Sequence, residues 1–269
     1  MHKLLIFTLL ALPAGLWGQV FQRPFEGAGS LSLGGATVAF PKTELGLTNE
    51  ALLGHAEKTG VWSSTAMPFG LTNWRNVRLQ AAFRLNPTSS LGFDFAQSGI
   101  EIFREQRLRL GYGRRIGKQA WLGGGFDYLR AQADEYGVIR AVNFGLGAMA
   151  KPFKNLCLGL QIHNPLSLKI NDFRVPGRIR FGVSWVASAT FMALSELEKD
   201  DARPASLKFG FQYQLHPKVA VRLGFRGAPG RASFGAGFKL GHGFSLDFAS
   251  EWHPVLGITP AAGFVWRRQ

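Results

Sequence analysis

Histidine and serine are the residues in this chain that could support acid–base or nucleophilic chemistry, but their spacing does not assemble a site. His163 falls within an apolar, alternating stretch, and Ser184 lies deeper on the next such stretch. A serine nucleophile needs its base and orienting acid within hydrogen-bonding reach. His216, His242 and His253 fall in predicted turns far apart in the sequence, without metal-ligand spacing. Neither G-x-S-x-G nor H-E-x-x-H occurs. The sequence therefore predicts no enzyme activity, no cofactor and no metal site.

Charged residues are the second set that could carry function. The formal net charge is +14, which raises the question of a nucleic-acid partner. Arg and Lys are spread singly, however, without a basic helix or a clustered tract. Many of the arginines occupy alternate positions, as Arg107 and Arg109 do between Leu108 and Leu110. This pattern excludes a nucleic-acid protein and places these charges on one face of β-strands.

The elements that must position these charges are clearest between Leu207 and Trp266. Apolar residues alternate there with glycine and polar residues through four consecutive segments, each bounded by a turn. Phe209 and Phe211, for example, flank Gly210. A soluble β-sandwich also alternates, but its polar face would carry many Lys, Glu and Thr. Segments of roughly 10 residues with an apolar band, aromatic ends and tight turns are typical of a transmembrane β-barrel. The sequence predicts an all-β fold, an antiparallel transmembrane β-barrel.

Alternating segments begin at Gly60 and continue to the end of the chain. They predict about 14 strands, or 12 if the segments Val61–Phe69 and Phe191–Leu197 do not span. Tight connections alternate with longer ones, and bacterial barrels keep short turns periplasmic and longer loops outside. We therefore expect both termini on the periplasmic side of the outer membrane of a Gram-negative bacterium.

The N-terminal part of the chain differs from the rest. Residues 1–18 combine a basic start with a short apolar run, the pattern of a secretory signal peptide. Residues 19–59 are rich in Gly, Ala and Ser, which let backbone approach backbone closely. This segment is either plug-like, folded into the barrel mouth, or an ordinary N-terminal strand and loop. Residues 60–269 form the predicted barrel.

Several motifs resemble those of a known family. They are Gly34-Gly35-Ala36, Asn49-Glu50-Ala51-Leu52, Lys208-Phe209-Gly210-Phe211-Gln212-Tyr213, Arg222-Leu223-Gly224-Phe225, Ser233-Phe234-Gly235-Ala236-Gly237 and the stretch from His253 to Pro260. The chain resembles the FadL-like outer-membrane barrels, and most closely the PorV/PorQ group of Bacteroidetes-type bacteria. Two features depart from the family: Glu50 stands where Pro is usual, and the chain ends in Arg267-Arg268-Gln269 instead of an aromatic residue. The resemblance implies a plugged barrel that serves hydrophobic-solute uptake or, in the PorV branch, a role beside the type IX secretion machinery.

The predicted strand register assigns one set of charged residues to the lumen. These lumen or ligand-binding candidates are Arg78, Arg84, Arg107, Arg109, Asp127, Arg178, Arg180 and Arg222. With Arg226, Lys208 and Lys239 against Asp94, Asp127, Asp247 and Glu251, the lumen is expected to be basic. A basic lumen suits a conduit for small hydrophobic or amphipathic anionic compounds, such as fatty acids. Alternatively, these arginines hold the plug, and the barrel is a structural or secretion-accessory protein without cargo.

A second set of arginines falls on the apolar, lipid-facing register. Arg104, Arg130 and Arg140 lie near the predicted outer ends of three successive strands. A guanidinium matches phosphate geometry, so these residues are candidates for contact with lipopolysaccharide. The alternative is that they merely snorkel toward water. The expected partners are therefore outer-membrane lipid and lipopolysaccharide, a hydrophobic ligand and, in the accessory alternative, proteins of the secretion machinery.

Overall fold

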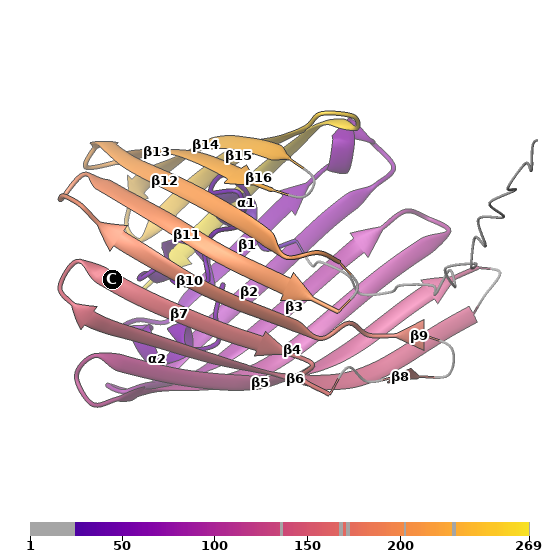
Figure 1. The fold of residues 1–269 in the computed structure, drawn as a ribbon, viewed down its shortest axis with the longest axis horizontal. Coiled ribbons are helices and arrows are strands. Elements are labelled where there is room, and N and C mark those ends of the chain that lie inside the picture. The colour runs from indigo at the N-terminus through magenta and orange to yellow at the C-terminus, as the bar shows by residue number, and fades with distance from the viewer. Residues whose placement is uncertain are drawn as a thin grey trace, which may run out of the picture.

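The computed structural model describes residues 25–134, 137–166, 169–170, 173–201, 203–227 and 230–268. The predicted signal peptide, residues 1–18, lies outside this range. Within the described residues, no helix is both long and apolar enough to cross a membrane. The architecture is a single closed antiparallel barrel with a short N-terminal segment inside it (Figure 1).

Fourteen described strands form the barrel wall, in the order β1-β16-β15-β14-β13-β12-β11-β10-β7-β6-β5-β4-β3-β2. Their bounds are β1 Gly60–Ala66, β2 Arg75–Asn86, β3 Ser89–Gly99, β4 Phe103–Ile116, β5 Ala120–Ala133, β6 Gly137–Phe153, β7 Leu156–His163, β10 Arg178–Val186, β11 Phe191–Asp200, β12 Ser206–His216, β13 Val219–Arg226, β14 Arg231–Gly241, β15 Phe244–His253 and β16 Gly257–Arg267. Pairing of β1 with β16 closes the wall. The prediction of an antiparallel barrel of about 14 strands is confirmed.

The alternation in sequence separates the two faces of the wall as predicted. On β12, Leu207 and Phe209 are 46% and 40% exposed on the outside, whereas Lys208 between them is 2% exposed on the inside. Phe126, Leu110 and many other large apolar side chains likewise point outward. A band of large apolar side chains around the outside of the wall favours lipid over water. Closure of the sheet leaves no strand edge with unpaired backbone groups in that lipid. The chain is an outer-membrane barrel of the Gram-negative type.

The two uncertain segments both contribute strands. Phe191–Asp200 forms β11 and pairs with β10 and β12. The segment predicted from Val61 to Phe69 forms β1, but the strand ends at Ala66 and a 3-10 turn, η2 (Pro68–Gly70), follows. Pro68 has no N–H to donate to the ladder, which explains why the predicted strand is too long.

The two ends of the barrel differ in their connections. At the end that we call the turn end, segments of two to four residues join β2–β3, β4–β5, β6–β7, β10–β11, β12–β13 and β14–β15. At the opposite end, the loop end, the connection from β7 to β10 is the longest and carries a small two-stranded ladder of β8 (Lys169–Ile170) and β9 (Phe173–Arg174). Strands β4 to β6 are longer than β7, β10 and β13, so one side of the wall is taller at the loop end (Figure 1).

Residues 25–59, the inner segment, lie inside the barrel and contain no strand. They hold α1 (Ala28–Leu31), η1 (Thr43–Leu45) and α2 (Leu52–His55). Helix α1 packs against β14 to β16, and α2 packs against β3 to β5. Most of the segment between Ala28 and Ala56 is buried.

Glycines on the inner face of the wall make room for this segment. A Cβ at Gly224 would lie 2.0 Å from the backbone nitrogen of Gly34, and one at Gly159 would lie 2.2 Å from the carbonyl oxygen of Val38. A Cβ at Gly123 would lie 2.2 Å from the carbonyl oxygen of Glu50. Only glycine permits such backbone-to-backbone approach.

Candidate functional site

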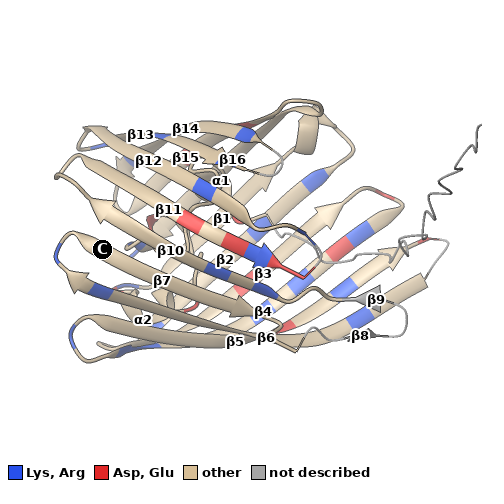
Figure 2. Cartoon of the chain, in the orientation of Figure 1, with Lys and Arg blue, Asp and Glu red and all other residues tan. Residues whose placement is uncertain are grey.

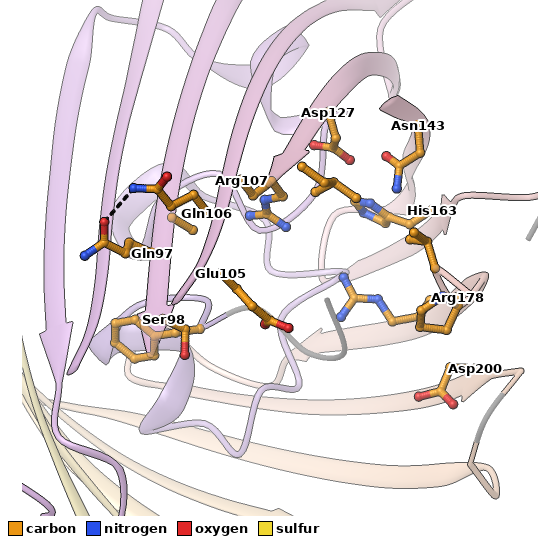
Figure 3. Close-up of a pocket in the computed structure, with 15 residues that line it drawn as sticks. Gln97, Ser98, Glu105, Gln106, Arg107, Asp127, Asn143, His163, Arg178 and Asp200 are labelled. Carbon is orange, nitrogen blue, oxygen red and sulfur yellow. Dashed lines mark hydrogen bonds between the residues drawn. The ribbon is translucent and has the colours of Figure 1, made fainter. Parts of the chain in front are cut away.

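The loop end contains a cavity with about 750 Å³ of empty space, partly open to solvent (Figure 3). Phe25, Leu129, Val175 and Pro176 provide apolar surface in its lining. Leu129 packs with Val175, which the long connection between β7 and β10 brings over the wall. A wider and more polar opening of about 1400 Å³ adjoins it, and Phe25 borders both spaces. We call the first space the mouth cavity.

Two polar side chains in the mouth cavity lack partners of their own. Arg178, the first residue of β10, is half-buried and makes no hydrogen bond or ion pair with a described residue. The carbonyl oxygen Oδ1 of Asn143, a residue only 7% exposed, has no hydrogen-bond partner among the described residues. Both side chains point into the same space in Figure 3. Apolar walls with a few convergent polar groups are the usual composition of a ligand pocket.

Below the mouth, Arg180 is the centre of a buried ion cluster. Its Nε donates to Oε1 of Glu196 at 2.7 Å, and its NH1 donates to Oε1 of Glu26 at 2.7 Å. Nζ of Lys208 lies 2.7 Å from Glu196 and 2.8 Å from Glu198. The four wall side chains, Arg180, Glu196, Glu198 and Lys208, are at most 2% exposed. The cluster joins β10, β11 and β12 to the inner segment.

The backbone of the inner segment also binds this cluster. Oε2 of Glu196 accepts hydrogen bonds from the N–H groups of Thr37 and Val38, both at 2.9 Å. The carbonyl oxygen of Gly35 accepts from NH2 of Arg180 at 3.2 Å and from Nζ of Lys208 at 3.3 Å. Charged groups on the wall therefore satisfy polar backbone groups that no secondary structure pairs.

A second cluster is built on Arg109 of β4. Arg109 forms a two-point ion pair with Asp127, with both nitrogen–oxygen distances at 2.6 Å, and also pairs with Glu50 of the inner segment. Its NH2 lies 2.7 Å from Nδ1 of His163. Gln161 donates to Oε2 of Glu50 at 2.9 Å. Glu50 thus binds the wall strands β4 and β7 from the inner segment.

Further arginines complete the inner lining. Arg78 donates to Asp94, with distances of 3.1 Å from Nε and 2.5 Å from NH2, and Arg107 donates to the same carboxylate at 3.2 Å. Arg222 pairs with Asp247. The bonds to Asp94 join neighbouring strands, whereas Arg222 of β13 reaches past β14 to Asp247 of β15. Arg78 also donates to the carbonyl oxygen of Leu47 in the inner segment at 3.4 Å.

The predicted lumen residues therefore divide into three groups. Arg78, Arg107, Arg109, Asp127, Arg180 and Arg222 lie inside the barrel in ion pairs. Arg178 lies at the mouth. Arg84 is exposed at the turn end, where it donates to the carbonyl oxygens of Glu57 and Asn86.

The expectation of a basic lumen requires correction. Each buried cation is met by carboxylates, including four that the sequence analysis did not count: Glu26, Glu50, Glu196 and Glu198. Lys239, expected in the lumen, is exposed at the turn end. The sequence pattern could have revealed two of these four acids. Glu196 and Glu198 flank Leu197, the spacing that places two residues on the same face of a strand. Nothing local marks Glu26 or Glu50, whose partners are far away in sequence.

The pKa of Glu26 reflects these contacts. Burial alone would raise the pKa, but Arg180 and Lys208 outweigh it and lower the pKa of Glu26 to about 2. The carboxylate is therefore charged at neutral pH, and its ion pair with Arg180 is present there.

The catalytic residues considered from sequence do not meet. Along the paired strands β7 and β10, His163 faces Arg178, whereas Ser184 faces Cys157 six residues further along. At roughly 3.3 Å per residue this separates them by about 20 Å. The described residues contain no group of three His, Cys, Asp or Glu side chains arranged to hold a metal ion.

Arg104, Arg130 and Arg140 lie on the outer face near the loop end, as the register predicts. Arg130 and Arg140 face each other directly across β5 and β6. The Arg130 guanidinium donates to Gln106 at 3.1 Å and to Gln132 at 2.8 Å, so amide side chains orient it beside a second cation.

Comparison with known proteins identifies the fold. No protein-family model and no curated protein match the sequence. Among solved structures, the chain is similar to the toluene transporter TbuX of Ralstonia pickettii, with a TM-score of 0.70 and 12% identity over 91% of this chain and 99% of that one. It is also similar to the CymD monoaromatic hydrocarbon channel, with a TM-score of 0.67 and 13% identity over 90% and 97% of the two chains. A Pseudomonas aeruginosa FadL homologue matches with a TM-score of 0.67 and 10% identity over 91% and 97%.

At these identities the likeness establishes the fold, which is that of the FadL-like barrels. The compared structures are described as a transporter and a channel. The likeness to the PorV/PorQ group stays a prediction.

Proposed function

We propose that this FadL-like barrel is an outer-membrane conduit for small hydrophobic or amphipathic compounds, captured first in the mouth cavity. The apolar lining of that cavity is the observation that carries the proposal. The fold shared with hydrocarbon transporters supports the same conclusion.

Within that class we expect compounds with an anionic head, which would bind Arg178 in a cavity that the carboxylates of Glu105 and Asp200 also line. Arg178 is a cation without an ion-pair partner among the described residues, and it borders the apolar surface of Phe25 and Pro176. A carboxylate could pair with the guanidinium while an alkyl chain lies on the apolar wall. Arg107 and Arg109 are less suited to this role, because Asp94, Asp127 and Glu50 already neutralise them.

Binding of dodecanoate and dodecanol to the purified barrel tests the proposal. Both carry the same chain, so the difference in affinity reports the contribution of the carboxylate. Arg178→Gln should weaken dodecanoate binding by about tenfold, the effect of one partly buried ion pair of about 1.4 kcal/mol. Dodecanol binding should change little. Arg75→Gln, at an exposed arginine of the loop end, is the matched control. If neither compound binds the parent protein, the conduit proposal is wrong.

A second function, a structural or type IX secretion-accessory barrel without cargo, is favoured by the ion clusters. Arg109 of β4 and Arg180 of β10 attach the inner segment to two separate strands of the wall through Glu50 and Glu26. A lumen held in this way suits a scaffold. Under this alternative, Arg109→Gln should expose the inner segment to protease. Neither the parent protein nor the variant should take up dodecanoate in liposomes. Uptake by the parent protein would reject it.

A further inference from the structure

The positive charge of the molecule is concentrated at the turn end. The described Lys and Arg residues at or next to the short turns, the start of β1, the end of β16 and η1 number twelve, against two acids, Glu44 and Glu57. The cations are Lys42, Lys58, Arg84, Arg114, Arg115, Lys118, Lys151, Lys154, Lys218, Lys239, Arg267 and Arg268. This excess of ten accounts for most of the net charge of +14. Figure 2 shows blue on the turns at this end.

Three of these cations surround a small cavity at the rim. Lys218, Lys239 and Arg267 line this solvent-open space together with Glu44 and Gln214. No side chain of the three makes a hydrogen bond or ion pair with a described residue. Two acids also line this space: Glu44 lies 3.7 Å from Lys42, and Asp247 pairs with Arg222. The rim therefore holds unneutralised charge, in contrast to the balanced ion clusters of the interior.

Six of these cations are placed away from the lipid-facing surface. Lys239 and Arg267 lie in the lumen-facing register of β14 and β16, and Arg84 lies in that of β2. Lys118, Lys154 and Lys218 occupy the turns themselves. Phospholipid headgroups surround the outside of a barrel, and the lumen-facing register directs Lys239, Arg267 and Arg84 away from that surface. A partner that covers the end of the barrel is the one that could contact these groups together.

We propose that the turn end is an electrostatic docking surface for an acidic segment of a periplasmic protein, with Lys218, Lys239 and Arg267 at its centre. Short turns lie on the periplasmic side of bacterial barrels, which places this surface in the periplasm. Clustered charge of one sign attracts a partner of opposite sign and orients it on approach. The inference concerns the end opposite the mouth cavity and does not depend on transport.

The test uses the full barrel in zwitterionic phosphatidylcholine nanodiscs and a fluorescein-labelled oligo-glutamate peptide, with oligo-glutamine as the neutral control. The turn-end variant carries Lys218→Gln, Lys239→Gln and Arg267→Gln. The matched variant carries Arg75→Gln, Arg104→Gln and Arg140→Gln, three exposed arginines at the loop end. Both variants lose the same charge. Migration in dodecyl sulfate before and after heating verifies that each barrel is folded.

We expect the turn-end variant to weaken oligo-glutamate binding by about tenfold at low ionic strength, and the matched variant to leave it within about twofold. Added salt should weaken binding to the parent protein most. Equal losses in both variants, or no binding to the parent protein, would overturn the proposal. The proposal would also be wrong if the turn-end variant loses co-purifying phosphatidylglycerol but keeps its peptide affinity. That result would show that the cations bind anionic lipid.

Discussion

Among single residues, carboxylates balance the charge of the arginines inside this barrel, and two of them, Glu26 and Glu50, come from the inner segment. Glu26, Glu50 and Glu196 each bind a wall arginine. Removing one member of such a buried pair leaves an unbalanced charge, which typically costs about 3–5 kcal/mol. The arginines could be predicted from sequence because strand register assigns them to one face. Glu26 and Glu50 could not, since no local pattern connects Glu26 with Arg180 or Glu50 with Arg109.

Acid should release the start of the inner segment. Because the folded-state pKa of Glu26 is about 2 and its ordinary value is 4.5, its ion pair contributes fully above about pH 4.5 and is lost as the pH falls toward 2. Pepsin cleavage near Glu26 should therefore increase between pH 4.5 and 2.5 in the detergent-solubilised protein, as followed by mass spectrometry. Glu26→Gln should be cleaved readily at both pH values. Cleavage of the parent protein that does not change with pH would contradict this role.

At the scale of elements, glycine on the inner wall decides where the inner segment can lie. Gly224→Ala should destabilise the folded state by about 1–3 kcal/mol, because the new Cβ would meet the backbone of Leu33 and Gly34, which cannot move independently. Urea unfolding in lipid vesicles measures the change. Gly230→Ala is the matched control, since a Cβ there meets no atom within 4 Å. Equal stability of the two variants would show that the contact with the inner segment is not tight.

We expect the outer surface of β5 and β6 to bind lipopolysaccharide. Arg130 and Arg140 face each other without an acid between them, so a bound phosphate would relieve their repulsion. Replacing both with Gln should reduce the lipopolysaccharide that co-purifies with the barrel and lower its melting temperature in lipopolysaccharide-containing vesicles. In vesicles of phosphatidylcholine alone the melting temperature should not fall. Unchanged lipopolysaccharide content would favour simple snorkelling.

Strand prediction succeeded where all the side chains on one face of the strand were large and apolar. It was least certain for β11. That strand carries Met192 and Leu194 inward, followed by Glu196 and Glu198 on the same face. A lumen face that changes from apolar to acidic along one strand weakens the period-two signal. The same change of character is what places two carboxylates beside Arg180 and Lys208.

At the scale of the whole molecule, the orientation of the barrel remains a prediction with a direct test. If the short turns are periplasmic, a membrane-impermeant maleimide should label Asn73→Cys in intact cells and should not label Lys118→Cys. Both changes are made with Cys157→Ser, which removes the buried native thiol. After the outer membrane is permeabilised, both positions should react. Labelling of Lys118→Cys alone in intact cells would reverse the assignment of the two ends.

The enclosed position of the inner segment has a consequence for the order of assembly. The segment immediately precedes β1, yet its partners lie on strands all around the wall, from β2 to β16. It cannot acquire those contacts until most of the wall exists, and such long-range contacts form slowly. Pairing of β1 with β16 then seals the wall around it. We expect the segment to settle late in biogenesis, so that a nascent barrel passes through a hollow stage before its interior is filled.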